Sequence, residues 1–177
     1  MHEYTRLQTE RLIIRPISMN DITSRFAYAS DKEHVKYMVH MPDETMKDSE
    51  DFIILCTKEW EKPLPRFYEF AVILQGKHIG GVSIYGTNEQ FTEGEIGWLL
   101  HRDYCGKGYA TEAVKALVVF CKDVLHLSKL VADCDNRNIA SMKVMNNIGM
   151  SLEYQNIPRQ YVKRDEHAFG NRFKMYL

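Results

Sequence analysis

A short glycine-containing loop is the segment of this sequence best suited to chemistry. In Tyr104-Cys-Gly-Lys-Gly-Tyr109, two glycines flank Lys107 just before a stretch with helical periodicity. The first turn of a helix exposes unpaired N–H groups and a partial positive charge. Glycines let the backbone curl so that such groups converge on an anion. Together with the charge of Lys107, the loop predicts a site for a diphosphate.

On its composition alone, the loop could instead be a strand-to-helix turn that binds no ligand. Two nucleotide-binding motifs are excluded. Lys107 is followed by Gly108 rather than Ser or Thr, so the loop is not a P-loop. Thr111 stands where the dinucleotide-binding fingerprint needs its third glycine. A nucleotide-dependent phosphotransferase and a Rossmann domain are therefore poor interpretations.

The elements that must position this loop alternate between strand and helix patterns. After the loop, apolar residues from Ala110 to Leu125 recur at i, i+3, i+4 and i+7, which predicts an amphipathic helix. Strands are expected at 7–17, 67–74, 79–85, 94–101, 130–134, 150–157 and 172–177, and helices at 18–29, 45–61, 108–125 and 138–148. This order predicts one mixed α/β domain over residues 1–177, built around one sheet.

Composition excludes several classes of function. The 177 residues carry 23 basic and 24 acidic side chains, a balance that argues against nucleic-acid binding. No apolar run approaches the length that spans a bilayer, and no signal peptide opens the chain. The four cysteines are widely spaced, which favours reduced thiols and a cytoplasmic location. No cluster of cysteine and histidine has the spacing of zinc ligands, so no metal site is expected.

Three segments, in this order, resemble the GNAT N-acetyltransferase superfamily. Gly106-Lys-Gly-Tyr-Ala-Thr-Glu-Ala113, after Glu95-Ile-Gly-Trp-Leu-Leu100, looks like its acetyl-CoA motif. The opening Leu7–Pro16, and Asn138–Ser141 followed by Ile148–Met150, are similar to the ribosomal-protein alpha-N-acetyltransferase (Rim-type) branch. The resemblance spans nearly the whole chain. It implies a central, mostly antiparallel, splayed sheet flanked by helices, with acetyl-CoA as the acyl-donor cosubstrate and, as in many relatives, a homodimer.

The resemblance also implies where the cofactor binds. Backbone amides from Cys105 to Ala110 would hold the pyrophosphate, and the end of the preceding strand would pair with the pantetheine. The implied cofactor-binding residues are Leu99, Leu100, Cys105, Gly106, Lys107, Gly108, Tyr109, Ala110, Asn138 and Ser141. Cys105 stands where the superfamily has Gln or Arg. Because backbone amides do most of the binding, we expect cofactor affinity to be retained but weaker.

The implied reaction is attack of a neutral amine on a thioester. Deprotonation at neutral pH costs about 1 kcal/mol for an alpha-amino group and roughly 4–5 kcal/mol for a lysine. Glu95, on the strand leading into the loop, is the candidate general base; the alternative is a glutamate that only orders the sheet edge. Many relatives have a tyrosine where this chain has Met145. The Rim-type resemblance instead implies Ser141 as proton donor, and the alternative for Ser141 is packing or capping at the start of its helix.

The acceptor is expected to be a primary amine, either a small molecule or a peptide N-terminus. Acidic residues within 43–51, with Glu89, Glu93 and Glu95, could attract a cationic amine, although acidic residues also favour helix starts. Met38, Met41 and Met46 could line an adaptable acceptor wall or pack in the core. The alternative function is a catalytically silent acyl-CoA-binding sensor, which the departures at Cys105 and Met145 keep open.

Overall fold

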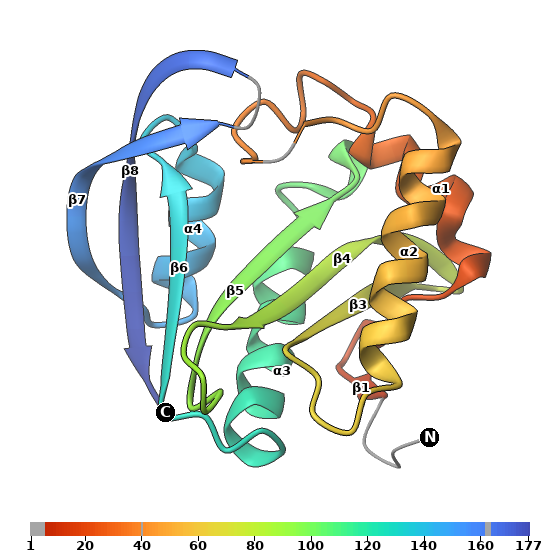
Figure 1. Ribbon diagram of the computed structural model, residues 1–177, viewed down its shortest axis with the longest axis horizontal. Coiled ribbons are helices and arrows are strands. Elements are labelled where there is room, and N and C mark those ends of the chain that lie inside the picture. The colour runs from red at the N-terminus through yellow and green to blue at the C-terminus, as the bar shows by residue number, and fades with distance from the viewer. Residues whose placement is uncertain (1–5, 40, 162–163) are drawn as a thin grey trace.

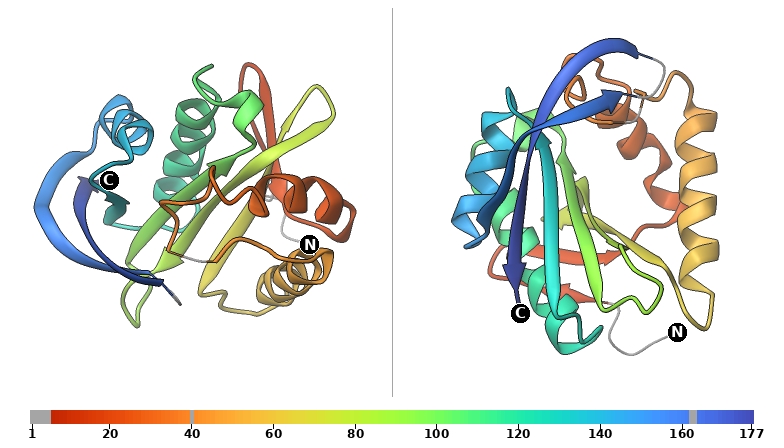
Figure 2. Two further views of the ribbon diagram at one scale, coloured as in Figure 1. Left: turned by 90° about the horizontal axis from the view of Figure 1, so that it is seen from above. Right: turned by 60° about the vertical axis from the view of Figure 1, so that its left-hand side comes forward.

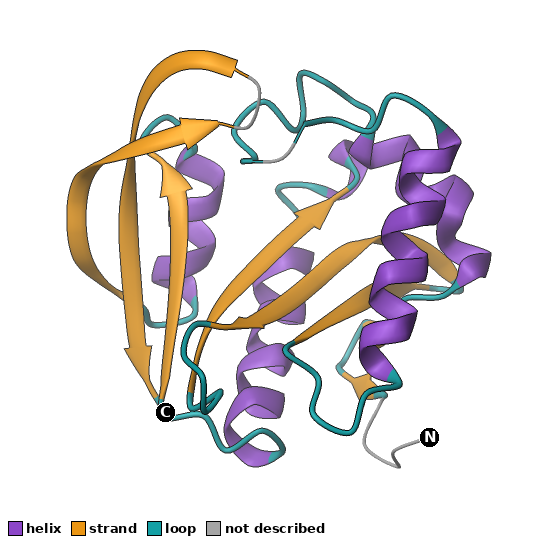
Figure 3. Cartoon of the chain, in the orientation of Figure 1, coloured by secondary structure: helices purple, strands orange, loops and turns teal. Residues whose placement is uncertain are grey.

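The computed structural model describes residues 6–39, 41–161 and 164–177. Figures 1 and 3 show how its strands and helices are arranged. The strands are β1 (Leu7–Gln8), β2 (Leu12–Pro16), β3 (Phe67–Leu74), β4 (Lys77–Gly86), β5 (Glu93–Leu100), β6 (Lys129–Asp135), β7 (Ser151–Tyr161) and β8 (Arg164–Tyr176). The helices are α1 (Ile22–Ala29), α2 (Met46–Trp60), α3 (Tyr109–Asp123) and α4 (Ile139–Asn147), with 3-10 turns at Met19–Asp21 and Arg102–Tyr104.

The strands form one sheet in the order β1-β2-β3-β4-β5-β6-β8-β7. Only the β5–β6 pair is parallel; the other neighbours run antiparallel. Helices α1 and α2 cover one face of the sheet, and α3 and α4 cover the other (Figure 2). The predicted mixed α/β fold with a mostly antiparallel sheet is confirmed.

The sheet divides into two arms between β5 and β6. These strands pair only at their first residues, through Glu93 with Lys129, Gly94 with Leu130 and Glu95 with Val131. Beyond these pairs the two strands separate, as Figure 1 shows. We call this opening the fork. It leaves one edge of β5 without a neighbouring strand and confirms the splay that the resemblance implied.

Two apolar clusters hold the layers together. The larger joins the sheet to α3, whose residues Ala113, Val114, Leu117, Phe120 and Cys121 are buried at the predicted helical spacing. The smaller joins Ile53 and Cys56 of α2 to the opposite face of the sheet. Because α3 is anchored along its length, its first turn is held firmly beneath the glycine loop.

Three details differ from the sequence prediction. The strand expected at 7–17 is divided into β1 and β2, because the chain turns where the Thr9 amide donates to Leu12 O at 2.9 Å. Strands β7 and β8 extend well beyond 150–157 and 172–177. Side chains of the edge strand β7 are mostly exposed, so no apolar alternation marks its full length.

Among the described residues, no helix is long and apolar enough to cross a bilayer, and no group of potential ligands could hold a metal ion.

Candidate active site

The glycine loop presents free amides at the start of α3. Gly106 and Gly108 adopt φ angles of 74° and 82°, a left-handed conformation that glycine takes without strain. Within the described chain, the amides from Gly106 to Ala110 donate to no protein acceptor. The Cys105 amide differs from the prediction, since it already donates to Arg102 O at 3.1 Å. The amides available to an anion are therefore those from Gly106 onward, at the positive end of α3.

The N-terminal segment braces this loop from outside. Glu112, in the first turn of α3, accepts hydrogen bonds from Thr9 Oγ1 at 2.5 Å and from the Arg11 amide at 2.9 Å. Arg11 donates from Nη1 to Lys107 O at 3.2 Å and lies over the Tyr109 ring, 4.5 Å from its centroid. Lys107 Nζ turns back to Asp103 O at 2.7 Å. The loop is thus held in shape by contacts that leave its amides free.

The backbone of β5 faces the fork on alternate residues. The His101 amide donates to Ile79 O at 2.8 Å, so it points toward β4. A Cβ placed on Gly80 would lie 2.3 Å from Leu99 O, so this carbonyl also faces β4. Since antiparallel strands alternate direction at each residue, the backbone groups of Trp98 and Leu100 face the fork. The backbone groups of Leu99 thus face β4, and Trp98, which the sequence prediction did not include, is the residue whose backbone faces the fork at this point.

Leu100 is only partly available for pairing. Its side chain is buried in the core, and its carbonyl lies 2.5 Å from His34 Nε2. The groups left on the open edge are the Trp98 amide and carbonyl and the Leu100 amide. This edge can accept an extended, amide-containing chain in the way a missing strand would pair.

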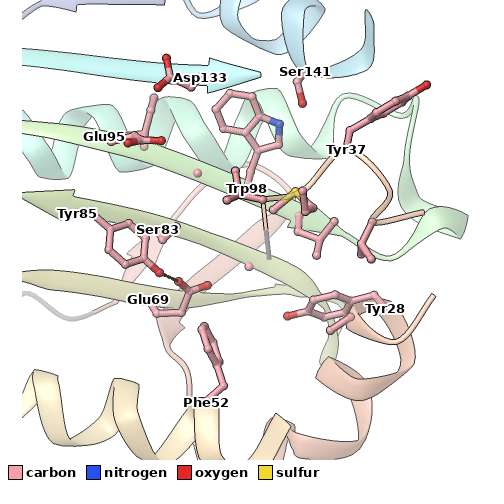
Figure 4. Close-up of a pocket in the computed structure, with 18 of the residues that line it drawn as sticks. Tyr28, Tyr37, Phe52, Glu69, Ser83, Tyr85, Glu95, Trp98, Asp133 and Ser141 are labelled. Carbon is pink, nitrogen blue, oxygen red and sulfur yellow. Dashed lines mark hydrogen bonds between the residues drawn. The ribbon is translucent and has the colours of Figure 1, made fainter. Parts of the chain in front are cut away.

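A cavity of about 620 Å³ extends from the fork toward α1 and α2. It brings together four residues predicted for the site, namely Glu95, Leu99, Asn138 and Ser141. The loop residues 105–110 are not part of its lining. Figure 4 shows Glu95 and Asp133 on one side of this cavity and Ser141 above Trp98. The loop with its free amides and the partly apolar cavity are therefore two separate features of the candidate site.

The start of α4 forms the wall across the fork. Asn138 caps this helix, because its Oδ1 accepts the Ser141 amide at 3.1 Å. The backbone amide of Ser141 thus takes part in capping the helix, as one alternative for this residue proposed. The Ser141 side chain lies in the cavity wall. Met145 is 1% exposed within the core, so it offers no group to the site. Ser141 is the hydroxyl that α4 presents to the cavity.

Glu95 has the surroundings of a general base. It is half-buried, and burial raises the pKa of its carboxyl. The negative charge of Asp133 raises the pKa of Glu95 further. Asp133 itself forms an ion pair with Arg172 at 2.7 Å. A carboxyl whose pKa is moved toward neutrality is well matched to accepting a proton near pH 7.

A second carboxyl in the cavity was missed by the sequence prediction. Glu69 on β3 is 9% exposed, and burial raises its pKa to about 8. Tyr85 Oη donates to Glu69 Oε2 at 3.3 Å (Figure 4). The sequence did carry a signal for Glu69, which is a charged residue inside the otherwise apolar strand Phe67–Leu74. Because burying a charge costs free energy, such a residue is a candidate for a functional role.

Cys105 and the acidic stretch make structural contacts, although Asp43 and Asp48 of that stretch also line the cavity. Burial raises the pKa of the Cys105 thiol, which does not favour a nucleophile. Asp48 caps α2 by accepting the Thr45 amide at 2.7 Å, so the helix-start explanation is correct for it. Asp43 pairs with Arg25. Neither Glu89 nor Glu93 lines the cavity, whereas Met38 and Met41 do, and Met46 is exposed.

Comparison with known proteins identifies the family. Residues 11–151 match the acetyltransferase (GNAT) domain family. The chain is 32% identical over 149 residues to an uncharacterized N-acetyltransferase of Bacillus subtilis, YnaD, covering 83% of each chain. It is 28% identical over 171 residues to an uncharacterized N-acetyltransferase of Bacillus licheniformis, p20, covering 97% of this chain and 93% of the relative.

Solved structures share the same fold. A GNAT-family acetyltransferase from Bacillus anthracis superimposes with a TM-score of 0.84 at 25% identity, covering 97% of this chain and 98% of that one. The ribosomal-protein alpha-N-acetyltransferase RimL, in complex with coenzyme A, gives 0.86 at 15% identity over 97% and 98% of the two chains. A spermidine N-acetyltransferase from Vibrio cholerae, in complex with CoA and spermine, gives 0.81 at 16% over 95% and 96%. The Rim-type branch is thus one of several structural neighbours. The chain belongs to the acetyltransferase (GNAT) domain family and is an acetyl-CoA-dependent acetyltransferase.

Proposed function

We propose that the protein transfers the acetyl group of acetyl-CoA to a primary amine of a small molecule, by direct attack on the thioester. The observation that carries this proposal is the succession of free amides from Gly106 to Ala110, the open edge of β5, and the cavity behind it. The amides suit a pyrophosphate, the edge suits the pantetheine amides, and the cavity suits an acceptor. Structural neighbours that bind coenzyme A support the same arrangement.

The reaction needs one proton removed and one delivered. The amine nitrogen forms a bond to the thioester carbon, and the carbon–sulfur bond breaks. We assign Glu95 to take the proton released by the amine, directly or through a water. We assign the Ser141 hydroxyl, on the opposite wall, to donate a proton to the departing sulfur. Because a thiol has a pKa near 8.5, departure as the thiolate costs only about 2 kcal/mol at neutral pH, so Ser141 assists but is not indispensable.

The cavity favours a small acceptor over a protein N-terminus. Both kinds of acceptor occur among the structural neighbours, since RimL is named for a ribosomal protein and the Vibrio cholerae enzyme for spermidine. Here α1 and α2 line the innermost wall, through residues such as Tyr28 and Phe52. An extended peptide would have to leave through this wall, whereas a compact amine fits inside it.

Calorimetry and a turnover assay together test the proposal. Acetyl-CoA is titrated into the protein, and release of free CoA is then followed with a panel of small amines and N-terminal peptides. We expect binding in a single site and product with at least one small amine. Binding without product from any amine would identify the sensor alternative. Product from peptides alone would exclude the small-molecule acceptor.

A further inference from the structure

The innermost part of the cavity is built around the buried carboxyl of Glu69. Figure 4 shows Tyr85 and Ser83 above it, Phe52 below and Tyr28 to one side. Ser83 is its cross-strand partner on β4, and the Tyr85 hydroxyl is its hydrogen-bond donor at 3.3 Å. Hydrogen bonds from the Tyr85 and Ser83 side chains both lower the pKa of Glu69, and a carboxylate has room for further donors.

Two glycines keep the floor of this region open. A Cβ on Gly81 would lie 2.8 Å from Glu69 Oε1, which is closer than side chains approach. A Cβ on Gly97 would lie 2.9 Å from Ser83 Oγ. Glu69, Ser83 and Gly97 lie side by side on β3, β4 and β5 in the register of the sheet. The absent side chains leave a passage across the sheet from Glu69 to the edge of β5.

No basic side chain of the described chain forms an ion pair with Glu69. The charge of Arg25 lowers the pKa of Glu69, but Arg25 is itself engaged elsewhere. Its guanidinium bonds to Asp43 and Ser49 and lies over the Phe52 ring, 3.9 Å from the centroid. Burial raises the pKa of Glu69 to about 8, which reflects the cost of charging this carboxyl without a counter-ion. A cation that enters the cavity would supply that counter-ion.

Glu95, at the other end of the cavity, is placed differently. Burial and the charge of Asp133 raise its pKa, whereas Arg172 and Arg159 lower it, so Glu95 already has two cationic neighbours, on β8 and β7. An additional cation is therefore better accommodated at Glu69 than at Glu95. The two carboxyls therefore differ in role. Glu95 accepts a proton at the reaction centre, and Glu69 can bind a cation.

The cation at Glu69 is not the attacking amine. An attacking amine must be neutral, whereas pairing with a carboxylate favours the protonated form. Strand β4 lies between β3 and β5, so Glu69 is roughly two strand spacings, about 10 Å, from the open edge. We infer that the acceptor is a small diamine, one ammonium of which binds Glu69 while the other nitrogen, a few methylene groups away, attacks the thioester. This inference rests on the proposed function and names the class of acceptor.

Matched acceptors test the inference. Wild-type protein is assayed with α,ω-diaminoalkanes of three to six carbons and with 1-aminoalkanes of the same lengths. We expect kcat/KM to favour each diamine over its monoamine by about ten-fold or more, the scale of one hydrogen-bonded charge pair. Glu69→Gln should bring this ratio close to one, mainly by raising KM for the diamines. The matched variant Glu95→Gln should lower kcat for both classes and leave their ratio unchanged.

The outcomes separate this inference from the proposed function. Equal turnover of monoamines and diamines by the wild type would overturn the diamine subsite but leave the acetyl transfer in place. Binding of acetyl-CoA without turnover of any amine would overturn the proposed function itself. If Glu69→Gln fails to fold, Gly81→Ala provides a second test, because its Cβ would displace the Glu69 carboxylate and should reduce the same ratio. An unchanged ratio in a folded Gly81→Ala protein would overturn the inference.

Discussion

Replacing Gly108 by Glu tests the cofactor-binding loop most directly. Gly108 has a φ angle of 82° and caps α3 with a free amide. A glutamate there must adopt a left-handed conformation, which costs about 1–2 kcal/mol of folding stability. It also brings a negative charge to the proposed diphosphate site. Its Cβ would lie 3.4 Å from Arg11 Nη2, which is ordinary van der Waals contact.

The loss of affinity can be estimated from electrostatics. Two like charges about 5 Å apart, at an effective dielectric constant of about 20, repel by roughly 3 kcal/mol. This repulsion raises the dissociation constant for acetyl-CoA by a factor on the order of 10². Isothermal titration calorimetry measures the constant, and thermal unfolding measures the cost of the backbone strain, expected to lower Tm by about 2–8 °C.

Gly76→Glu is the matched control. Gly76 lies in the turn between β3 and β4 with a φ angle of 80°, and a Cβ there would meet nothing within 4 Å. It therefore introduces the same strain and charge away from the loop, and should lower Tm similarly while leaving the affinity intact. If Gly108→Glu binds acetyl-CoA as tightly as Gly76→Glu does, the loop does not hold the diphosphate.

Three further variants test other parts of the site. Glu95→Gln should lower kcat by about 10²-fold or more with little change in acetyl-CoA affinity; a wild-type rate across pH 6–9 would show that Glu95 is not the base. Glu69 has a pKa of about 8, above its ordinary value of 4.5, so the folded protein retains a proton that the unfolded chain releases. The free energy of unfolding should therefore fall by up to about 2 kcal/mol as pH rises from 6 to 8. Urea titrations should show this decrease in the wild type and its loss in Glu69→Gln. The variant keeps the other titratable or charged groups around the position, which are Arg25, Tyr28, Tyr85 and Cys56. The same pH dependence of the unfolding free energy in both proteins would show that another group takes up the proton. Glu112→Ala removes the brace and should weaken acetyl-CoA binding several-fold, whereas an unchanged dissociation constant in calorimetry would show that the loop keeps its shape without it.

The loop and the helix behind it could be predicted from sequence because both depend on local rules. Glycines at Gly106 and Gly108 permit the left-handed turns, and the spacing from Ala110 onward defines the buried face of α3. The mostly antiparallel pairing and the splay of the sheet were implied by the resemblance rather than by periodicity. Strand β7 was underestimated because an exposed edge strand has no apolar alternation to reveal its end.

The inner half of the cavity could not be predicted because it depends on register between strands. Glu69 becomes a neighbour of Ser83 and Tyr85 only through the pairing of β3 with β4. Likewise, the preference for Trp98 over Leu99 on the open edge follows from which residues of β5 bond to β4. A shift of one residue would reverse both assignments, and no property of the residues in isolation fixes that register.

The fork has a consequence for how long the protein survives. Its two arms share only the three β5–β6 residue pairs at their base. A donor molecule seated along β5 and against the start of α4 would tie the arms together, so its binding energy would add to the stability of the fold. At a concentration one hundred times its dissociation constant, this amounts to about 2.7 kcal/mol. Resistance to proteolysis would then rise and fall with the supply of activated acetyl groups.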